Sequence, residues 1–137
     1  LGAPRHALEN SLENETVAPS QRLACLAVRY IHDNIDRRLP IEEIASHVHV
    51  SPRHLSRLIH EFTGASPAAY IETARMDRAR ALLHKSNLPI KEIAQRVGYN
   101  DVHHFTRVFS RSCGISPGAF RDGKSDVRKI QKPGDLV

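Results

Sequence analysis

Two groups of hydrogen-bond donors, about 50 residues apart, carry the chemistry that this chain could perform. They consist of Arg53, Ser56, Arg57 and His60, and of His103, Thr106, Arg107 and Ser110. Within each group the spacing places the side chains on one side of a helix, and neither group contains an acid. Arginine can present two parallel donors to O6 and N7 of guanine, while Ser, Thr and His can meet base edges or phosphates. The pattern therefore favours nucleic-acid recognition. An ordinary solvated helix face is the alternative, which the repetition disfavours.

The two groups lie in two copies of one sequence unit. Residues 39–62 read LPIEEIASHVHVSPRHLSRLIHEF, and residues 88–109 read LPIKEIAQRVGYNDVHHFTRVF. The first parts of the copies match at an offset of 49, and after one extra residue in the middle turn the offset becomes 50. A unit that occurs twice predicts a body with two lobes, because a solenoid would need at least about three stacked units.

Each copy predicts a helix, a tight turn and a second helix. In the first copy a buried face is indicated by the i, i+3, i+4, i+7 series Ile41, Ile44, Ala45 and Val48. Ser51 is suited to cap the second helix and Pro52 to begin it. In the second copy Gly98 permits the turn, and Asn100 or Asp101 can cap.

The second helix of each copy also has an apolar stripe, which predicts the core of each lobe. The stripe residues are Leu55, Leu58, Ile59 and Phe62 in the first copy, and Phe105, Val108 and Phe109 in the second. Opposite faces of one helix would thus pack inward and present donors outward.

The repeat resembles the DNA-binding domain of AraC/XylS-type transcription regulators over roughly residues 21–121. The resemblance rests on SPRHLSRL at 51–58, on I-A-x-x-V-G-Y-x-D-x-x-x-F-x-R-x-F at 93–109 and on G-x-S-P-x-x-F-R at 114–121. It implies an all-α fold with a seven-helix body, in which a long central helix joins two helix-turn-helix lobes and each lobe places its second helix in the major groove of double-stranded DNA. Base contacts implied by the resemblance fall on Arg53, Ser56, Arg57, Val102, His103, Thr106 and Arg107. His103 and His104 occupy positions that vary among relatives, so no base preference carries over to them. A surface for RNA polymerase is also implied.

The domain boundaries follow from these patterns. We expect a linker remnant at residues 1–18 and a flexible basic tail at residues 123–137. Between them, residues 19–122 should form a tandem helix-turn-helix domain, with lobes at about 21–64 and 88–121 and a linker helix at about 66–86. The first helix should start at Pro19, brace the first lobe and end near Arg37 and Arg38. Ser116 and Pro117 should open a short last helix.

The linker helix has a mechanical role in this interpretation. About 19 helical residues give a rod of roughly 28 Å, which together with the lobes could set the distance of about 34 Å between successive major grooves. Its arginines, Arg75, Arg78 and Arg80, could pair with Glu72 and Asp77, and we interpret them as structural.

The charge distribution favours a polyanionic partner. The formal net charge is +5, but residues 1–36 carry 3 basic and 5 acidic side chains, whereas residues 37–137 carry 17 basic and 10 acidic. The positive charge therefore follows the repeats. A membrane surface or an acidic protein would satisfy the same charge. The alternative function is accordingly a protein-interaction module that docks an acidic partner such as RNA polymerase.

Other classes of function find little support in the sequence. The histidines lack cysteine or carboxylate partners at a known metal-ligand spacing, and no nucleophile elbow, phosphate loop or paired acids occur, so we expect neither a metal, a cofactor nor an enzyme. Cys25 and Cys113 are interpreted as small buried hydrophobes. The sequence has no run of about 18 apolar residues, which a membrane span would require. A cytoplasmic location is consistent with this. Because the chain starts at Leu1 and its single methionine is Met76, we expect it to be part of a larger protein. The fragment should be monomeric, and the full-length protein could dimerise through a missing domain.

Overall fold

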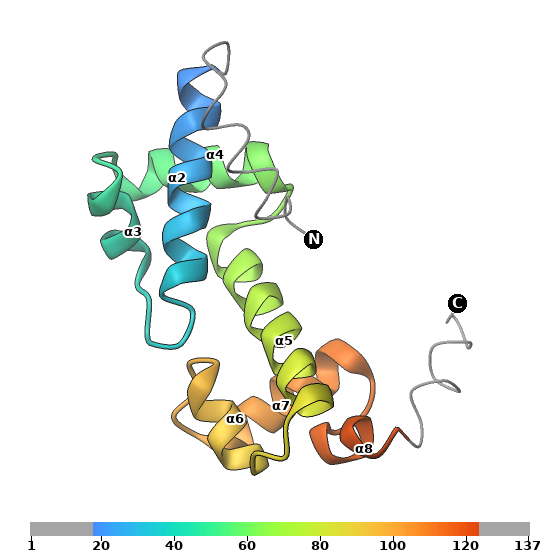
Figure 1. Cartoon of the computed structure of the whole chain (residues 1–137). Helices are drawn as coiled ribbons and strands as arrows, with labels where there is room; N and C mark the ends of the chain where they lie inside the picture. The colour runs from blue at the N-terminus through green and yellow to red at the C-terminus, as the bar shows by residue number, and fades with distance from the viewer. Residues whose placement is uncertain (1–17, 124–137) are drawn as a thin grey trace. The chain divides into compact units, whose positions relative to one another are not determined.

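Seven helices and no strand make up residues 18–123, the part of the chain that the computed structural model describes (Figure 1). They are α2 (Pro19–Asp33), α3 (Ile41–His47), α4 (Pro52–Thr63), α5 (Pro67–Lys85), α6 (Ile90–Arg96), α7 (Val102–Cys113) and α8 (Pro117–Asp122). The predicted all-α class with seven helices is confirmed. The predicted linker remnant and basic tail fall, except for Ala18 and Gly123, outside the described residues.

The chain folds into two compact units, and the boundary between them lies within α5. The first ends at Ala74 and contains α2, α3, α4 and the first part of α5. The second begins at Arg75 and contains the rest of α5 with α6, α7 and α8. Each unit has its own cluster of buried apolar side chains, so each copy of the repeat builds a separate core.

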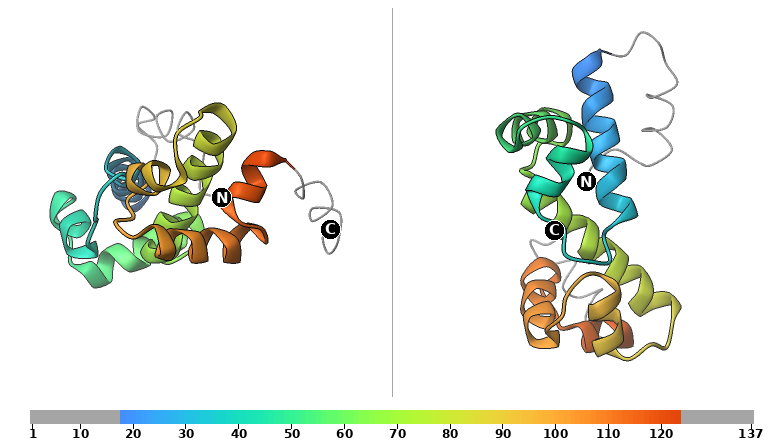
Figure 2. Two further views of the ribbon diagram at one scale, coloured as in Figure 1. Left: turned by 90° about the horizontal axis from the view of Figure 1, so that it is seen from below. Right: turned by 90° about the vertical axis from the view of Figure 1, so that its left-hand side faces the viewer.

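The core of the first unit forms where α2 packs against α3 and α4, as Figures 1 and 2 show. Ile31 of α2, Ile44 of α3, and Leu55 and Ile59 of α4 are fully buried in one cluster. Tyr70 of α5 joins this cluster, and its hydroxyl lies 2.7 Å from Nε2 of His32 on α2. The first helix therefore braces the first lobe as predicted.

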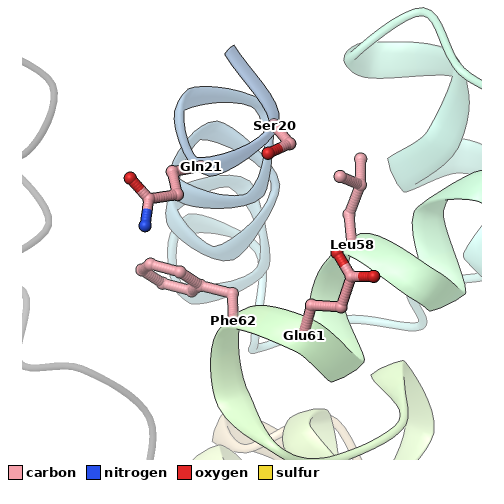
Figure 3. A pocket seen from close by; sticks show the side chains of 5 residues that line it. All are labelled: Ser20, Gln21, Leu58, Glu61 and Phe62. Atoms are coloured by element: carbon pink, nitrogen blue, oxygen red, sulfur yellow. The ribbon is translucent and has the colours of Figure 1, made fainter. Parts of the chain in front are cut away.

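A hollow of about 440 Å³ lies between the start of α2 and the end of α4 (Figure 3). Its lining residues are Ser20, Gln21, Leu58, Glu61 and Phe62. Phe62, predicted to be core, is only half-buried, because it stands at the edge of this hollow.

The core of the second unit is centred on the aromatic side of α7. Phe105 and Phe109 are fully buried, and their rings lie 5.8 Å apart. Phe120 of α8 meets Phe109 edge-on at 5.6 Å. Ile93 of α6 and Met76 of α5 complete this cluster. The predicted stripe of α7 is thus buried, as is that of α4 apart from Phe62.

Side-chain caps start the helices where the sequence predicts them. The Ser51 hydroxyl accepts a hydrogen bond from the His54 backbone N–H at 3.1 Å, and that of Ser116 accepts from Ala119 at 3.1 Å. In the second copy the cap is Asp101, whose Oδ1 accepts from the His103 N–H at 2.9 Å. These bonds satisfy amide groups that the first turn leaves without a helical partner.

The middle turns confirm the change of offset between the copies. The first helices, α3 and α6, start 49 residues apart, and the second helices, α4 and α7, start 50 apart. Gly98 has φ of 94° in the second turn, and the aligned His49 has φ of 62° in the first. His49 was not predicted to occupy this left-handed conformation, which glycine adopts without a steric cost.

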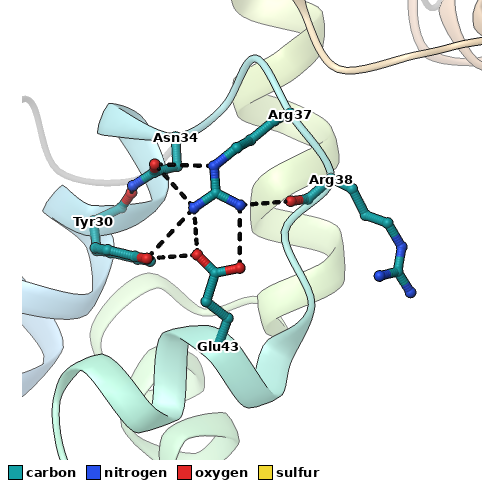
Figure 4. Close-up of polar contacts among 5 residues, drawn as sticks. All are labelled: Tyr30, Asn34, Arg37, Arg38 and Glu43. Carbon is teal, nitrogen blue, oxygen red and sulfur yellow. Dashed lines mark hydrogen bonds and ion pairs between the residues drawn. The ribbon is translucent and has the colours of Figure 1, made fainter.

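The predicted end of the first helix near Arg37 and Arg38 is wrong, because α2 ends at Asp33. Asn34 stops the helix: its side-chain amide donates to the Tyr30 carbonyl at 2.9 Å, and its Oδ1 accepts from Nε of Arg37 at 3.2 Å. Arg37 also pairs with Glu43 of α3, which accepts a 2.5 Å hydrogen bond from the Tyr30 hydroxyl. This network, drawn in Figure 4, fixes the connection between α2 and α3.

The carboxylate at the centre of this network is held ionised. Hydrogen bonds from Arg37 and then from Tyr30 lower the pKa of Glu43 to about 2. The same bond to Glu43 raises the pKa of the Tyr30 hydroxyl. Arg37 is therefore engaged within the protein.

Two of the three arginines of α5, Arg75 and Arg80, have structural partners, in agreement with their interpretation. Arg80 forms an ion pair with Asp77, and the Arg75 guanidinium lies over the Tyr99 ring, 5.6 Å from its centroid. Nη1 of Arg80 also lies 3.1 Å from Sγ of Cys113. Cys25 is buried as predicted, but Cys113 is only half-buried, because it ends α7 beside this charged side chain.

Arg121 of α8 ties together the connection between α5 and α6. Its Nε donates to the Leu83 carbonyl at 3.2 Å, Nη1 to Leu88 at 2.7 Å and Nη2 to Ser86 at 3.2 Å. These carbonyls lie in the last turn of α5 and in the segment that follows it. One planar guanidinium thus satisfies backbone acceptors that the end of a helix leaves unpaired.

Candidate nucleic-acid interface

The outer face of α4 presents the first predicted group of donors. Arg53, Arg57 and His60 are exposed and Ser56 is half-buried. The cap at Ser51 and the buried Leu55 fix the rotation of the helix, so these four side chains share its outward side. The acid of this helix, Glu61, lines the hollow beside Leu58 and Phe62 (Figure 3).

Arg57 has a partner that the sequence did not indicate. Its Nη2 lies 3.2 Å from Nδ1 of His54, one turn earlier on α4. His54 is half-buried, and its backbone N–H donates to Ser51. The spacing of three residues was visible in the sequence, but the orientation of both side chains was not.

The outer face of α7 presents the second group. His103 and Arg107 are exposed, while Val102, Thr106 and Ser110 are half-buried. Asp101 starts the helix, and the buried Phe105 and Phe109 set its rotation. The predicted residues therefore form one face on α4 in the first unit and one on α7 in the second.

Asp101 adds a negative charge to the start of the second face. Its pKa is lowered chiefly by the hydrogen bond from the His103 backbone N–H, with smaller contributions from the His104 N–H and from the charge of Arg107, while desolvation opposes them. The sequence suggested Asp101 only as a cap. A carboxylate at the start of this face can also repel phosphate.

The aligned histidines of the two helices have different surroundings. His104, which matches His54 at the offset of 50, has its ring edge-on to Tyr99 at 5.3 Å. Tyr99 in turn contacts Phe105 and lies beneath Arg75. His104 thus belongs to an aromatic group at the turn, whereas His54 contacts an arginine of the outer face.

Two other kinds of feature are absent from residues 18–123. No group of three or more His, Cys, Asp or Glu side chains lies in a position to hold a metal ion there. None of the helices in that same range is long and apolar enough to cross a membrane.

Two units, each with a short helix, a tight turn and an outward donor face on the next helix, define a tandem helix-turn-helix protein. Comparison with known families agrees: residues 44–123, more than half of the chain, match a helix-turn-helix domain family. An uncharacterized HTH-type transcriptional regulator of Bacillus subtilis (strain 168), YfiF, is 39% identical over 125 residues, which cover 88% of this chain and 40% of that protein.

Solved structures give the same result. A transcriptional regulator from Chromobacterium violaceum, described as containing an AraC-type DNA-binding domain, is 32% identical with a TM-score of 0.70, covering 75% of this chain and 92% of that one. The DNA-binding domain of AdpA, solved in complex with a target DNA, is 26% identical with a TM-score of 0.70, covering 80% and 97%. The chain belongs to the AraC-type helix-turn-helix family of transcription regulators.

Proposed function

We propose that this chain is a sequence-specific DNA-binding domain of a transcription regulator, and that α4 and α7 enter adjacent major-groove segments of a promoter or operator. The observation that carries the proposal is the pair of outward donor faces, at aligned positions of the repeat, each opposite a fully buried stripe. The solved complex of the AdpA domain with its target DNA supports it. The proposed contact residues are Arg53, Ser56, Arg57, His60, Val102, His103, Thr106 and Arg107.

Within this set Arg57 and Arg107 are the proposed readers of guanine. Both are exposed at aligned positions, and a bidentate arginine contact discriminates against the wrong base by about 1–3 kcal/mol. Ser56 and Thr106 lie one position earlier and can meet base edges or phosphates. The half-buried Val102 offers an apolar contact, for which the thymine methyl group is the natural partner.

The proposal also concerns the oligomeric state and the other partners. The chain spans 40% of the length of the YfiF relative. We propose that the fragment binds DNA as a monomer and that a further domain could dimerise the full-length protein. RNA polymerase is a second proposed partner, the proposed location is the cytoplasm, and we propose no enzymatic activity. A module that only docks an acidic protein is disfavoured, because it would not require an outward donor face on both second helices.

Selection from a random duplex library of about 30 base pairs tests the proposal, since two grooves recur at about 10.5 base pairs per turn. We expect two enriched blocks with centres about one turn apart. Arg57→Ala should then relax one position of one block, and Arg107→Ala one position of the other, each by about 1–3 kcal/mol. Arg22→Ala on α2 is the matched control, because it removes an exposed arginine outside both faces.

The control separates base reading from general attraction. At low salt every variant should bind DNA of any sequence less tightly than the unaltered chain, because each variant has lost one positive charge that attracts phosphate. Each neutralised phosphate contributes a slope of about −0.9 in log K against log salt. The two face variants alone should also change the preferred sequence. Salt-sensitive binding without any enriched sequence would overturn the proposal.

A further inference from the structure

The contact between His54 and Arg57 gives each side chain a distinct role. A guanidinium has N–H donors and no acceptor, so the 3.2 Å contact from Nη2 of Arg57 requires a lone pair on Nδ1 of His54. The tautomer that accepts this hydrogen bond is the neutral imidazole with its proton on Nε2. An imidazolium would offer a donor to a donor, and two like charges one turn apart on a helix would repel.

This contact leaves the arginine able to read a base. Nη2 carries two N–H bonds, and His54 accepts only one of them. The second N–H of Nη2 is not used in this contact, nor are those of Nη1 and Nε, so two parallel donors remain for guanine O6 and N7. His54 itself is half-buried at the start of α4 while Arg57 is exposed, so the imidazole is the more enclosed of the two side chains.

The second copy has no equivalent contact among the interactions of its aligned histidine. His104 lies against the ring of Tyr99, and the helix cap is the carboxylate of Asp101. In the first copy the cap is the neutral Ser51. The neutral acceptor beside Arg57 is thus a property of the first copy and does not follow from the repeat.

We propose that His54 is a positioning residue, which orients the Arg57 guanidinium and so raises the selectivity of α4 at the base pair that Arg57 reads. The inference rests on the proposed function. Arginine has many rotamers, and freezing them on binding costs free energy. A side chain already held in the reading orientation loses less freedom, and the gain applies only to the base pair that requires this orientation.

Competition binding by the full chain, on the duplex that selection supplies, tests the role of His54. His54→Ala should reduce discrimination at the base pair read by Arg57 by about 2- to 10-fold, the range expected for one hydrogen bond. His54→Asn should retain most of the discrimination, because an amide oxygen can occupy the place of Nδ1 and accept. Neither change should alter discrimination in the second block.

A double-mutant cycle and a matched control separate positioning from a structural role. In the Arg57→Ala background, His54→Ala should have no further effect on discrimination at that base pair. His104→Ala, which removes the aligned imidazole from α7, should leave the first block unchanged. An equal loss of affinity for all sequences, or the same loss with and without Arg57, would overturn the role of His54. If the unaltered chain selects no sequence, the proposed function itself fails; if it selects two blocks and His54→Ala keeps full discrimination, only this inference fails.

Discussion

Replacing Arg121 by methionine should loosen the second unit while leaving the first intact. Methionine keeps an unbranched stem of similar length but removes every donor. The three carbonyls that Arg121 now satisfies, those of Leu83, Ser86 and Leu88, would lose their partner together. These carbonyls lie where α5 connects to α6, so the change should destabilise the helix-turn-helix of the second copy.

The size of the effect follows from the contacts and from the exposure of the side chain. A hydrogen bond from a charged donor contributes about 1.5–3 kcal/mol. Arg121 is half-buried, so water can replace part of what the carbonyls lose, and the three bonds are not additive. We therefore expect a loss of about 2–4 kcal/mol in the free energy of unfolding of the second unit. Arg121→Lys should lose less stability than Arg121→Met but should not retain that of the unaltered chain, since an ammonium lacks the planar set of donors that matches three carbonyls.

Native-state hydrogen exchange measures this loss helix by helix. Amides of α6 and α7 should exchange faster in Arg121→Met, while those of α2, α3 and α4 keep their protection. Binding to the selected duplex should lose the second block before the first. Arg96→Met is the matched control: Arg96 forms an exposed ion pair with Glu92 at 2.9 Å, so its removal should cost about 0–1 kcal/mol.

Two outcomes would refute the reasoning about Arg121. A loss no larger than that of Arg96→Met would mean that the three carbonyls are satisfied equally well by water. Faster exchange spread evenly over α2 to α8 would mean that Arg121 supports the whole chain and not the connection between α5 and α6.

Two further substitutions probe features of the first unit. The pKa of Glu43 is lowered to about 2, so its contribution to stability is complete above its ordinary value of about 4.5 and disappears as the pH falls to about 2. Glu43→Gln should accordingly flatten the decline in stability over this range, as followed by urea unfolding, and an unchanged acid profile would contradict the network. His49→Gly should raise the free energy of unfolding by about 0.5–1 kcal/mol, because the relief of the left-handed backbone exceeds the entropy that glycine adds to the unfolded chain; a lower midpoint in urea would contradict this.

The sequence predicted the helix caps, the buried stripes and the extra residue of the second turn, because each depends on neighbouring residues. Ser51, Asp101 and Ser116 cap their helices because a short side chain with an oxygen at that position satisfies a free amide whatever surrounds it. The stripes of α4 and α7 are largely buried because helical periodicity determines which residues share a face. The repeat also predicted the extra residue between α6 and α7, since seven identities before it fix one offset and the following matches fix another.

The errors and omissions concern side chains that act over longer distances. Charge alone suggested that Arg37 could lie in the last turn of the first helix, but Asn34 ends the helix earlier and Arg37 pairs with Glu43 on the next one. The three carbonyl partners of Arg121 lie 33 to 38 residues away. No periodicity predicts such contacts, because they depend on how the folded backbone presents its unpaired groups.

The differences between the two copies bear on selectivity more than their similarities do. Both copies place an arginine at the same position of the second helix, yet Arg57 contacts an imidazole, whereas the cap at the start of α7 is the carboxylate of Asp101. A neutral acceptor beside Arg57 leaves the positive charge of α4 intact, whereas the carboxylate of Asp101 weakens the attraction of α7 for phosphate. If both arginines read guanine, α4 should therefore combine base reading with strong backbone attraction, and α7 should contribute more selectivity relative to its affinity. A lower salt slope for binding through α7 than through α4, measured on duplexes that keep only one block, is the result that this argument requires.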